Sequence, residues 1–368
     1  MKRLIKAVML SLVIIVAVIF GGFSAYAEEY AGESTAEVSE NIDSALEEYG
    51  IEYSCNDMES LTLPGFFSSV RKAIEDRIRA PLKLFGAIFA VVIFSSLTKV
   101  TGESLLRSNS GANLCSYITI ITAVTAITPR VFEVYGNSMT AVEQTGGFMA
   151  IFIPLFAGIS IMSGGVFSAG AYNAITLFSA ELLIELSREF LMPLLLINSA
   201  LSVVGSIYSD YSLDSLSALI KKVVTWLLTV SVTLFTGFIT LKTKLGASTD
   251  SFTTKTAKFV ISGFVPVVGS AVSDAYTTVK GSFGVMKSTA GTAGIVAILL
   301  LLIPPVIEVF AYRTVMWAGS TIAEMFSVKP VEKLLKGIDS GLAIIMSVLI
   351  CFGVLFTVST AVLMSSFT

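Results

Sequence analysis

The chain has 368 residues, of which 54% are hydrophobic and 14% are charged, and its mean hydropathy is +0.83. Soluble domains are about 25% charged, so this composition excludes a soluble enzyme and favours a protein whose surface faces lipid. The net charge of -3 does not favour a nucleic-acid partner. The chain has no histidine and its three cysteines lie far apart, so we expect no His-based catalysis, no metal site and no cofactor.

The N-terminus has the pattern of a signal peptide, residues 1–27. Three basic residues precede an apolar run from Ala7 to Phe20. Ala25 and Ala27 then follow in the spacing of a cleavage site. We expect cleavage after Ala27, and an uncleaved N-terminal anchor is the alternative. In both cases the chain after this segment begins outside the cytoplasm.

Residues 28–63 form an acidic extracytoplasmic leader. Eleven acidic residues and no Lys or Arg lie between Glu28 and Pro64. Residues 28–41 lack an apolar period, so we expect them to be disordered, either as a solvated leader or as a binding arm. Residues 64–81 differ, because apolar residues recur at helical spacing among charged ones. This pattern predicts an amphipathic helix at the membrane surface.

Residues 82–368 contain nine apolar segments near the length of a membrane-crossing helix, which needs about 17–25 residues. They are 82–98, 114–135, 148–162, 171–187, 190–208, 223–241, 259–279, 294–312 and 341–364. The sequence therefore predicts an all-α polytopic membrane protein. Apolar stripes at 213–220 and 328–338 predict two further interfacial amphipathic helices.

The distribution of positive charge favours eight transmembrane helices over nine. With nine, the Lys-rich segments 242–258 and 313–340 both lie outside, against the positive-inside rule. Both move to the cytoplasm if one early segment is re-entrant. The candidate is 148–162, which is short and contains Pro154 and Gly158. We therefore predict about eight transmembrane helices and one re-entrant segment.

The segment 259–279 has the length of a span but is interrupted by small and polar residues. They are Ser262, Gly263, Pro266, Gly269, Ser273 and Asp274. Proline removes a backbone donor from a helix, so we expect a break between Ser262 and Pro266. Irregular backbone at membrane depth requires protein or water around it. Two interpretations stay open, namely close packing by another helix and the lining of a pore or substrate path.

Glu181, Glu185 and Glu308 are further candidate intramembrane acids. Glu181 and Glu185 share one helical face in 171–187, and Glu308 lies late in 294–312. An ionised acid at the bilayer centre costs about 2.5–3.5 kcal/mol on insertion-based scales. These side chains should therefore face the bundle or lie near the interface. Arg188 is a candidate ion-pair partner for Glu185.

The run Phe-Val-Pro-Val-Val-Gly-Ser-Ala-Val-Ser-Asp-Ala at 264–275, preceded by Lys255 and Lys258, resembles the stage III sporulation protein AE family. The resemblance extends to the signal peptide, the acidic leader and Leu-Met-Pro-Leu-Leu-Leu at 191–196, although Ser270 replaces a frequent glycine. It implies an integral membrane subunit of a multi-protein channel complex, in the mother-cell membrane that surrounds the forespore. It implies no catalytic residue.

Two functional hypotheses follow. The first is a non-enzymatic channel subunit whose partners are other membrane subunits and the lipid bilayer, and this hypothesis is also compatible with a homo-oligomer. The second is a self-contained secondary transporter that couples through Glu181 or Asp274. Because the sequence has no GxxxxGK[ST] loop, any use of ATP falls to a partner.

Overall fold

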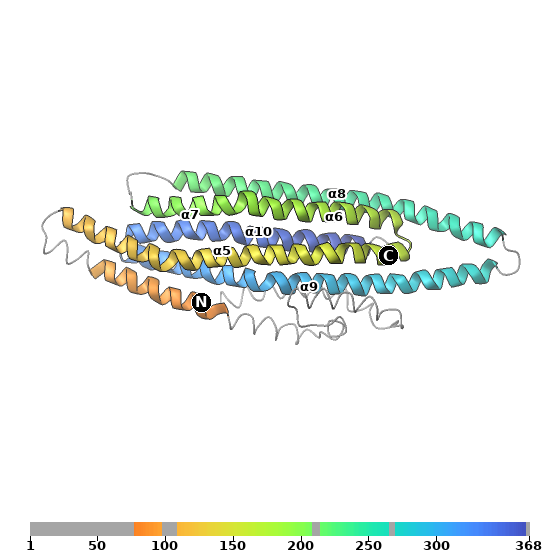
Figure 1. Ribbon diagram of the computed structural model, residues 1–368, viewed down its shortest axis with the longest axis horizontal. Coiled ribbons are helices and arrows are strands. Elements are labelled where there is room, and N and C mark those ends of the chain that lie inside the picture. Colours follow the sequence, from red (N-terminus) through yellow and green to blue (C-terminus); the bar gives the residue numbers. More distant parts are fainter. Residues whose placement is uncertain (1–76, 98–108, 208–213, 265–268, 366–368) are drawn as a thin grey trace.

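The computed structural model describes residues 77–97, 109–207, 214–264 and 269–365. Throughout these ranges the chain is helical apart from short turns, as the sequence predicts. The helices lie side by side in an elongated bundle (Figure 1). Their bounds are Arg77–Leu97, α5 (Asn109–Met162), α6 (Val166–Leu186), the π-helix η2 (Ser187–Leu191), α7 (Met192–Ile207), α8 (Asp214–Phe264), α9 (Gly269–Met325) and α10 (Lys329–Met364).

Six helical stretches of the described residues are long and apolar enough to cross a membrane, so the predicted count of eight is not confirmed. The difference arises because neighbouring apolar segments share one helix. Residues 114–135 and 148–162 both lie in α5, and the candidate re-entrant segment is the last part of that helix. The one charged residue between the two segments, Glu143, has good helix propensity and does not end the helix.

A π-helical turn joins α6 to α7. The backbone N–H of Met192 donates to the carbonyl of Ser187, five residues earlier. Pro193 follows and lacks the N–H that an α-helix would use to bond the carbonyl of Glu189. The two apolar segments predicted on either side of this turn therefore lie along one helical stretch, Val166–Ile207.

The helices are much longer than one bilayer crossing. α5 has 54 residues and α9 has 57, which at 1.5 Å per residue makes them about 81 and about 86 Å long. The hydrocarbon core of a bilayer is about 30 Å thick. When such a helix crosses once, a large part of it lies outside the core, where charged side chains are tolerated.

α10 is the central helix of the bundle. It contacts α5, α6, α7, α8 and α9, and its buried residues are spread along its length. A Cβ at Gly337 would overlap Ser202 Oγ, and a Cβ at Gly341 would overlap Tyr135 Oη. Glycine at these two positions therefore lets α7 and α5 pack directly against α10.

Aromatic rings fill the core between α5, α6 and α9. Phe148, Phe152 and Phe156 stack along α5 with ring centroids 5.6 and 5.3 Å apart. Tyr172 of α6 meets Phe156 edge to face, with centroids 5.7 Å apart. Gly294 of α9 lies against the Phe152 ring, where a Cβ would overlap it. Each ring pair adds about 0.5–1.5 kcal/mol beyond the burial of its area.

The bundle has two ends. The turn 163–165 between α5 and α6 lies at one end, and the turn 326–328 between α9 and α10 lies at the other (Figure 1). We call them the 163–165 end and the 326–328 end. α8 extends to the 163–165 end, where its Asp250 contacts the start of α6, whereas α10 begins at the 326–328 end.

The two Lys-rich segments lie at opposite ends of the bundle. Residues 242–258 lie on the part of α8 that reaches the 163–165 end, whereas residues 329–336 begin α10. The prediction that both face the cytoplasm required two crossings between them, one of them by 259–279. That segment is instead divided between the end of α8 and the start of α9, and α9 continues as one helix. The structure therefore places a single long helix, α9, between the two segments.

The predicted interfacial helices are continuous with longer ones. Residues 214–220 form the first turns of α8, and residues 329–338 form those of α10. Residues 77–81 likewise are part of the longer helical stretch Arg77–Leu97, and the rest of that predicted segment, 64–76, lies outside the described residues. The signal peptide and the acidic leader lie outside the described residues.

Candidate functional site

A buried carboxylate of α8 caps the first turn of α6. Asp250 is 1% exposed, and its two carboxylate oxygens accept hydrogen bonds from the backbone N–H groups of Phe167 and Ser168, at 2.9 and 3.0 Å. The residue at the N-cap of α6, Gly165, provides no side-chain cap. The N-terminus of a helix has unsatisfied donors and a partial positive charge, so it stabilises an anion. Asp250 therefore supplies from α8 the cap that α6 lacks.

Two glycines bring α8, α9 and the turn 163–165 together. A Cβ at Gly246, one helical turn before Asp250, would lie 2.8 Å from the backbone nitrogen of Ser168. Gly164 has a φ of +94°, which glycine adopts readily, and a Cβ there would lie 2.8 Å from Lys280 Cε. Larger residues at either position would move the helices apart and lengthen the hydrogen bonds of the cap.

A second buried charge, on Lys287 of α9, acts together with Asp250. Lys287 is 2% exposed, and its ammonium group interacts electrostatically with the Asp250 carboxylate. Moving a charge out of water is costly unless an opposite charge or hydrogen bonds compensate. The two side chains and the start of α6, which we call the Asp250 cluster, therefore connect α6, α8 and α9 at the 163–165 end.

Glu308 of α9 binds side chains from two other helices. Arg77 Nη1 donates to Glu308 Oε2, and Asn137 Nδ2 of α5 donates to Glu308 Oε1 at 3.4 Å. The Glu308 side chain is 14% exposed and that of Arg77 is 39% exposed. The carboxylate thus faces the bundle, and its contacts hold the helix Arg77–Leu97 against α9 and α5.

Polar contacts also hold α10 near the 326–328 end. Arg313 of α9 donates two hydrogen bonds to Asp339 of α10, from Nε at 2.9 Å and from Nη2 at 3.4 Å. Asn198 of α7 donates from Nδ2 to the carbonyl of Gly337 at 3.2 Å. A bidentate arginine–carboxylate pair fixes orientation as well as distance.

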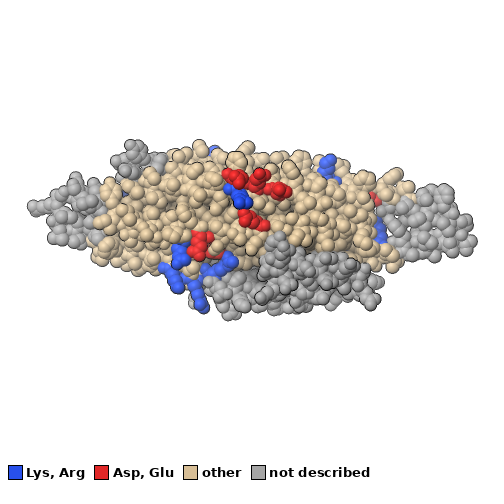
Figure 2. All heavy atoms as spheres, viewed as in Figure 1, with Lys and Arg blue, Asp and Glu red and all other residues tan. Residues whose placement is uncertain are grey.

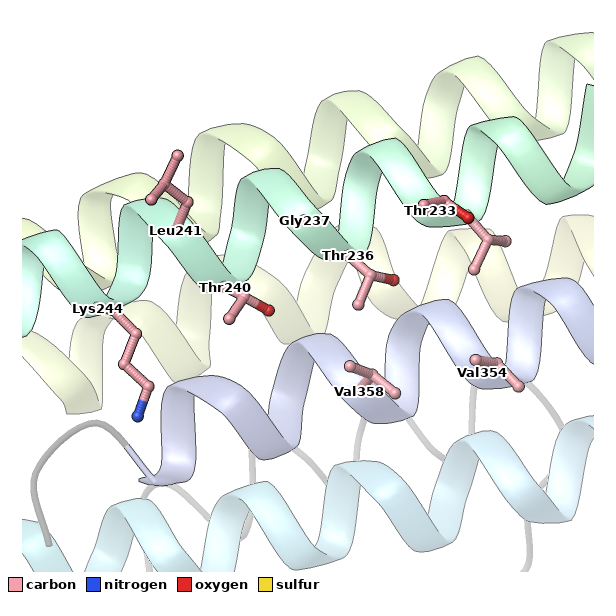
Figure 3. Close-up of a pocket in the computed structure, with 9 residues that line it drawn as sticks. Thr233, Thr236, Gly237, Thr240, Leu241, Lys244, Val354 and Val358 are labelled. Carbon is pink, nitrogen blue, oxygen red and sulfur yellow. The ribbon is translucent and has the colours of Figure 1, made fainter.

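A groove of about 650 Å³ lies between α8 and α10 (Figure 3). Its lining residues are Val232, Thr233, Thr236, Gly237, Thr240, Leu241, Lys244, Val354 and Val358. Figure 3 shows Thr236 and Thr240 projecting from α8 toward α10, and the amino group of Lys244 at one end of the groove. In the described part of the chain, Lys244 forms no ion pair. The groove is therefore mostly apolar and has a cation at one end.

The arrangement of these side chains suits helix assembly and the binding of an apolar or anionic ligand. The acids of the clusters described above are occupied by cations, amides or backbone donors. Within the described ranges, no group of three or more His, Cys, Asp or Glu side chains could hold a metal ion.

Glu181 and Glu185 are exposed on α6, in contrast to Glu308. Arg188 is exposed as well, and over the described helices it forms no ion pair with Glu185. Figure 2 shows one group of acidic and basic atoms near the middle of this face of the molecule, and a second, mostly basic group below and to the left of it. These acids were expected to face the bundle or to lie near the membrane interface. Glu181 and Glu185 do not face the bundle interior.

The residues of the interrupted segment lie on both sides of the junction between α8 and α9. Ser262 and Gly263 are in the last turn of α8, and Gly269, Ser273 and Asp274 are in the first turns of α9. α8 ends at Phe264, two residues before Pro266, and Pro266 itself lies outside the described residues, as do Ala25 and Ala27. The segment therefore reverses the chain direction at the 163–165 end and does not form a broken span.

The sequence alone does not single out Asp250, Lys287 or Arg77 as site residues. Asp250 lies among lysines and threonines, a composition typical of a loop, and Arg77 lies in a segment predicted to be interfacial. One signal was available for Asp250, because it is the only acidic residue among the four lysines of 242–258. A lone acid within a basic helical segment suggests a specific partner.

Comparison with known proteins identifies similar chains. A family model described as Stage III sporulation protein AE matches residues 46–366, which include all six long helices. The chain is 26% identical over 285 residues to the Stage III sporulation protein AE of Bacillus subtilis (strain 168). The aligned region covers 77% of this chain and 71% of that relative. No solved structure matches the chain.

Proposed function

Because the chain belongs to the stage III sporulation protein AE family, we propose that it is a non-enzymatic membrane subunit of a channel complex that links the mother cell to the forespore. The family match over residues 46–366 carries the proposal. The six long apolar helices support a multi-pass position in the membrane.

The proposal includes an orientation in the membrane. Cleavage of the signal peptide after Ala27 leaves the acidic leader outside the cytoplasm. The helix that begins at Arg77 runs toward the 326–328 end, since Arg77 contacts Glu308 and Ile88 lies beside Gly319. The 326–328 end is then cytoplasmic, and the 163–165 end lies in the space between the mother-cell and forespore membranes.

The contacts between helices support the role of an assembly subunit. The Asp250 cluster holds the bundle at one end, and the Arg313–Asp339 pair holds it near the other. The outer surface of α8 is apolar and exposed, with Trp226 at 65% and Phe238 at 52%. Such a surface faces lipid or another membrane subunit.

Affinity purification from sporulating cells tests the channel role. The full-length chain carries a C-terminal tag at its own chromosomal locus, and complexes are extracted in mild detergent. We expect other membrane proteins to co-purify in fixed proportion, and deletion of the chain to block spore formation. Recovery of the chain alone from cells that sporulate normally without it would contradict the proposal.

A self-contained secondary transporter is the second candidate, and the Asp250 cluster is the observation that favours it. The cluster buries opposite charges between the helices of a multi-pass membrane protein, which is one feature of coupling sites. The purified chain in sealed vesicles distinguishes the two functions. A transporter moves a solute alone and loses that flux in the Asp250→Asn variant, whereas a channel subunit produces no flux without its partners.

A further inference from the structure

The groove between α8 and α10 lies in a part of the chain that is apolar enough to cross a membrane. α8 contributes the candidate span Ser215–Thr253, and the predicted apolar segment 223–241 ends directly before Lys242. The groove begins near Val232 and ends at Lys244. Its polar end therefore coincides with the end of the apolar segment, where a lysine side chain reaches the headgroup layer.

The small side chains of α8 give the groove its depth. Gly237 lies between Thr236 and Thr240, and no atom lies within 4 Å of the position that a Cβ on Gly237 would take. Across from them, Val354 and Val358 of α10 present methyl groups (Figure 3). The space is open around Gly237 because the neighbouring lining positions 233, 236 and 240 of α8 carry threonines.

The length of the groove suits an acyl chain. The twelve residues from Thr233 to Lys244 extend about 16 Å along α8, which is about half of the thickness of a bilayer's hydrocarbon core. One acyl chain of a single leaflet therefore matches the groove in length.

We propose that this groove binds an anionic phospholipid, with the phosphate on Lys244 Nζ and one acyl chain along Val354 and Val358. The ammonium group at the end of the groove complements the phosphate, and the apolar walls complement the chain. This inference does not depend on the channel role, because it concerns only the surface of one chain in its membrane.

Native mass spectrometry of the detergent-purified full-length protein tests the charge component. The probes are phosphatidylglycerol, which is anionic, and phosphatidylethanolamine, which has no net charge. We expect Lys244→Gln to weaken the binding of phosphatidylglycerol about fivefold and to affect phosphatidylethanolamine less. The matched control is Lys255→Gln, because Lys255 is an exposed lysine on the same helix outside the groove. Equal binding of the two lipids by the unmodified protein would overturn the proposal.

A second variant tests the apolar component. Gly237→Leu fills the groove without a clash, since the space beside Gly237 is open. Its control is Gly136→Leu on α5, where the space is equally open and lies outside the groove. We expect the first variant alone to reduce retention of phosphatidylglycerol several-fold. Unchanged retention, or an equal loss in both variants, would overturn the proposal, as would a disulfide from Gly237→Cys to another membrane protein in place of bound lipid.

Discussion

α10 and α8 each contain a stretch apolar enough to cross a membrane, but α10 is central in the bundle and α8 is peripheral. In the most apolar 18 residues of α10, 61% are buried, against 22% in α8. The glycines of α10 lie against side chains of neighbouring helices, whereas Gly237 of α8 faces open space. Apolar composition therefore identifies both as candidate membrane helices. Whether the glycines of a helix contact side chains of other helices then distinguishes the central helix from the peripheral one.

α8 packs on the bundle through buried apolar residues such as Val224 and Ile239, and it also has one buried charged attachment, the Asp250 cluster. Asp250→Ala removes the acceptor for two backbone N–H groups and leaves the Lys287 charge without that carboxylate. Each buried donor left without a partner costs about 1–3 kcal/mol, so we expect the largest loss of stability here. Thermal unfolding of the purified protein in detergent measures it.

Asp250→Asn is the matched control, because the amide oxygen can still accept one hydrogen bond from α6. It should lose less stability than Asp250→Ala. The double variant Asp250→Ala, Lys287→Met should recover part of the loss, because it removes both charges. An Asp250→Ala protein that unfolds at the temperature of the unmodified protein would contradict the role of the cluster.

Equivalent glycine substitutions in α10 and α8 test the comparison directly. A Cβ at Gly341 overlaps Tyr135 Oη and lies 3.2 Å from Asn198 Nδ2, so Gly341→Leu overfills the core. Overpacking costs about 1–3 kcal/mol. Gly237→Leu meets open space and should change stability by less than about 0.5 kcal/mol. Equal losses in the two variants, measured by thermal unfolding, would remove the distinction between a central and a peripheral helix.

Glu308 provides a smaller effect. Glu308→Gln keeps the shape of the side chain and weakens its bonds to Arg77 and Asn137. Because Arg77 is 39% exposed, solvent screens the pair, and we expect a loss of about 1 kcal/mol. Limited proteolysis should detect earlier release of the helix Arg77–Leu97. A cleavage pattern identical to that of the unmodified protein would show that this contact does not hold the helix.

The smallest effects are expected at exposed charges. Arg130 and Glu133 of α5 are 59% and 55% exposed and form an ion pair at 3.0 Å. Arg130→Gln should change stability by less than about 0.5 kcal/mol, and Glu181→Gln on α6 should be similarly mild. A large loss in the Glu181 variant would instead indicate a specific partner for that acid.

Composition and apolar run length predicted the helical membrane class, since both depend on local sequence alone. The number of crossings was harder to predict, because charges inside 54- and 57-residue helices resemble the charges of loops. Charge counting depends on how many crossings separate two segments. Because 259–279 is divided between α8 and α9, one predicted crossing is lost, and the predicted side of the membrane changes for one of the two Lys-rich segments.

The same difference between local and tertiary features decides which site residues could be predicted from the sequence. Glu308 could be singled out because an acid inside an apolar run is costly wherever it lies. Its partner Arg77 could not, because their pairing spans 231 positions. Asp250 was hidden because its role is to cap a helix 83 positions away, and tertiary contacts of this kind leave no periodic signal in the sequence.

The central claim is that one crossing separates the Lys-rich segments of α8 and α10. Single cysteines at Ser251 and Lys329, both exposed, test it in a chain whose Cys55, Cys115 and Cys351 are replaced by serine. The variants are expressed in growing cells and treated with an impermeant thiol reagent before and after permeabilisation. We predict labelling at 251 in intact cells, and at 329 only after permeabilisation. Labelling of both positions in intact cells, or of neither, would contradict the account.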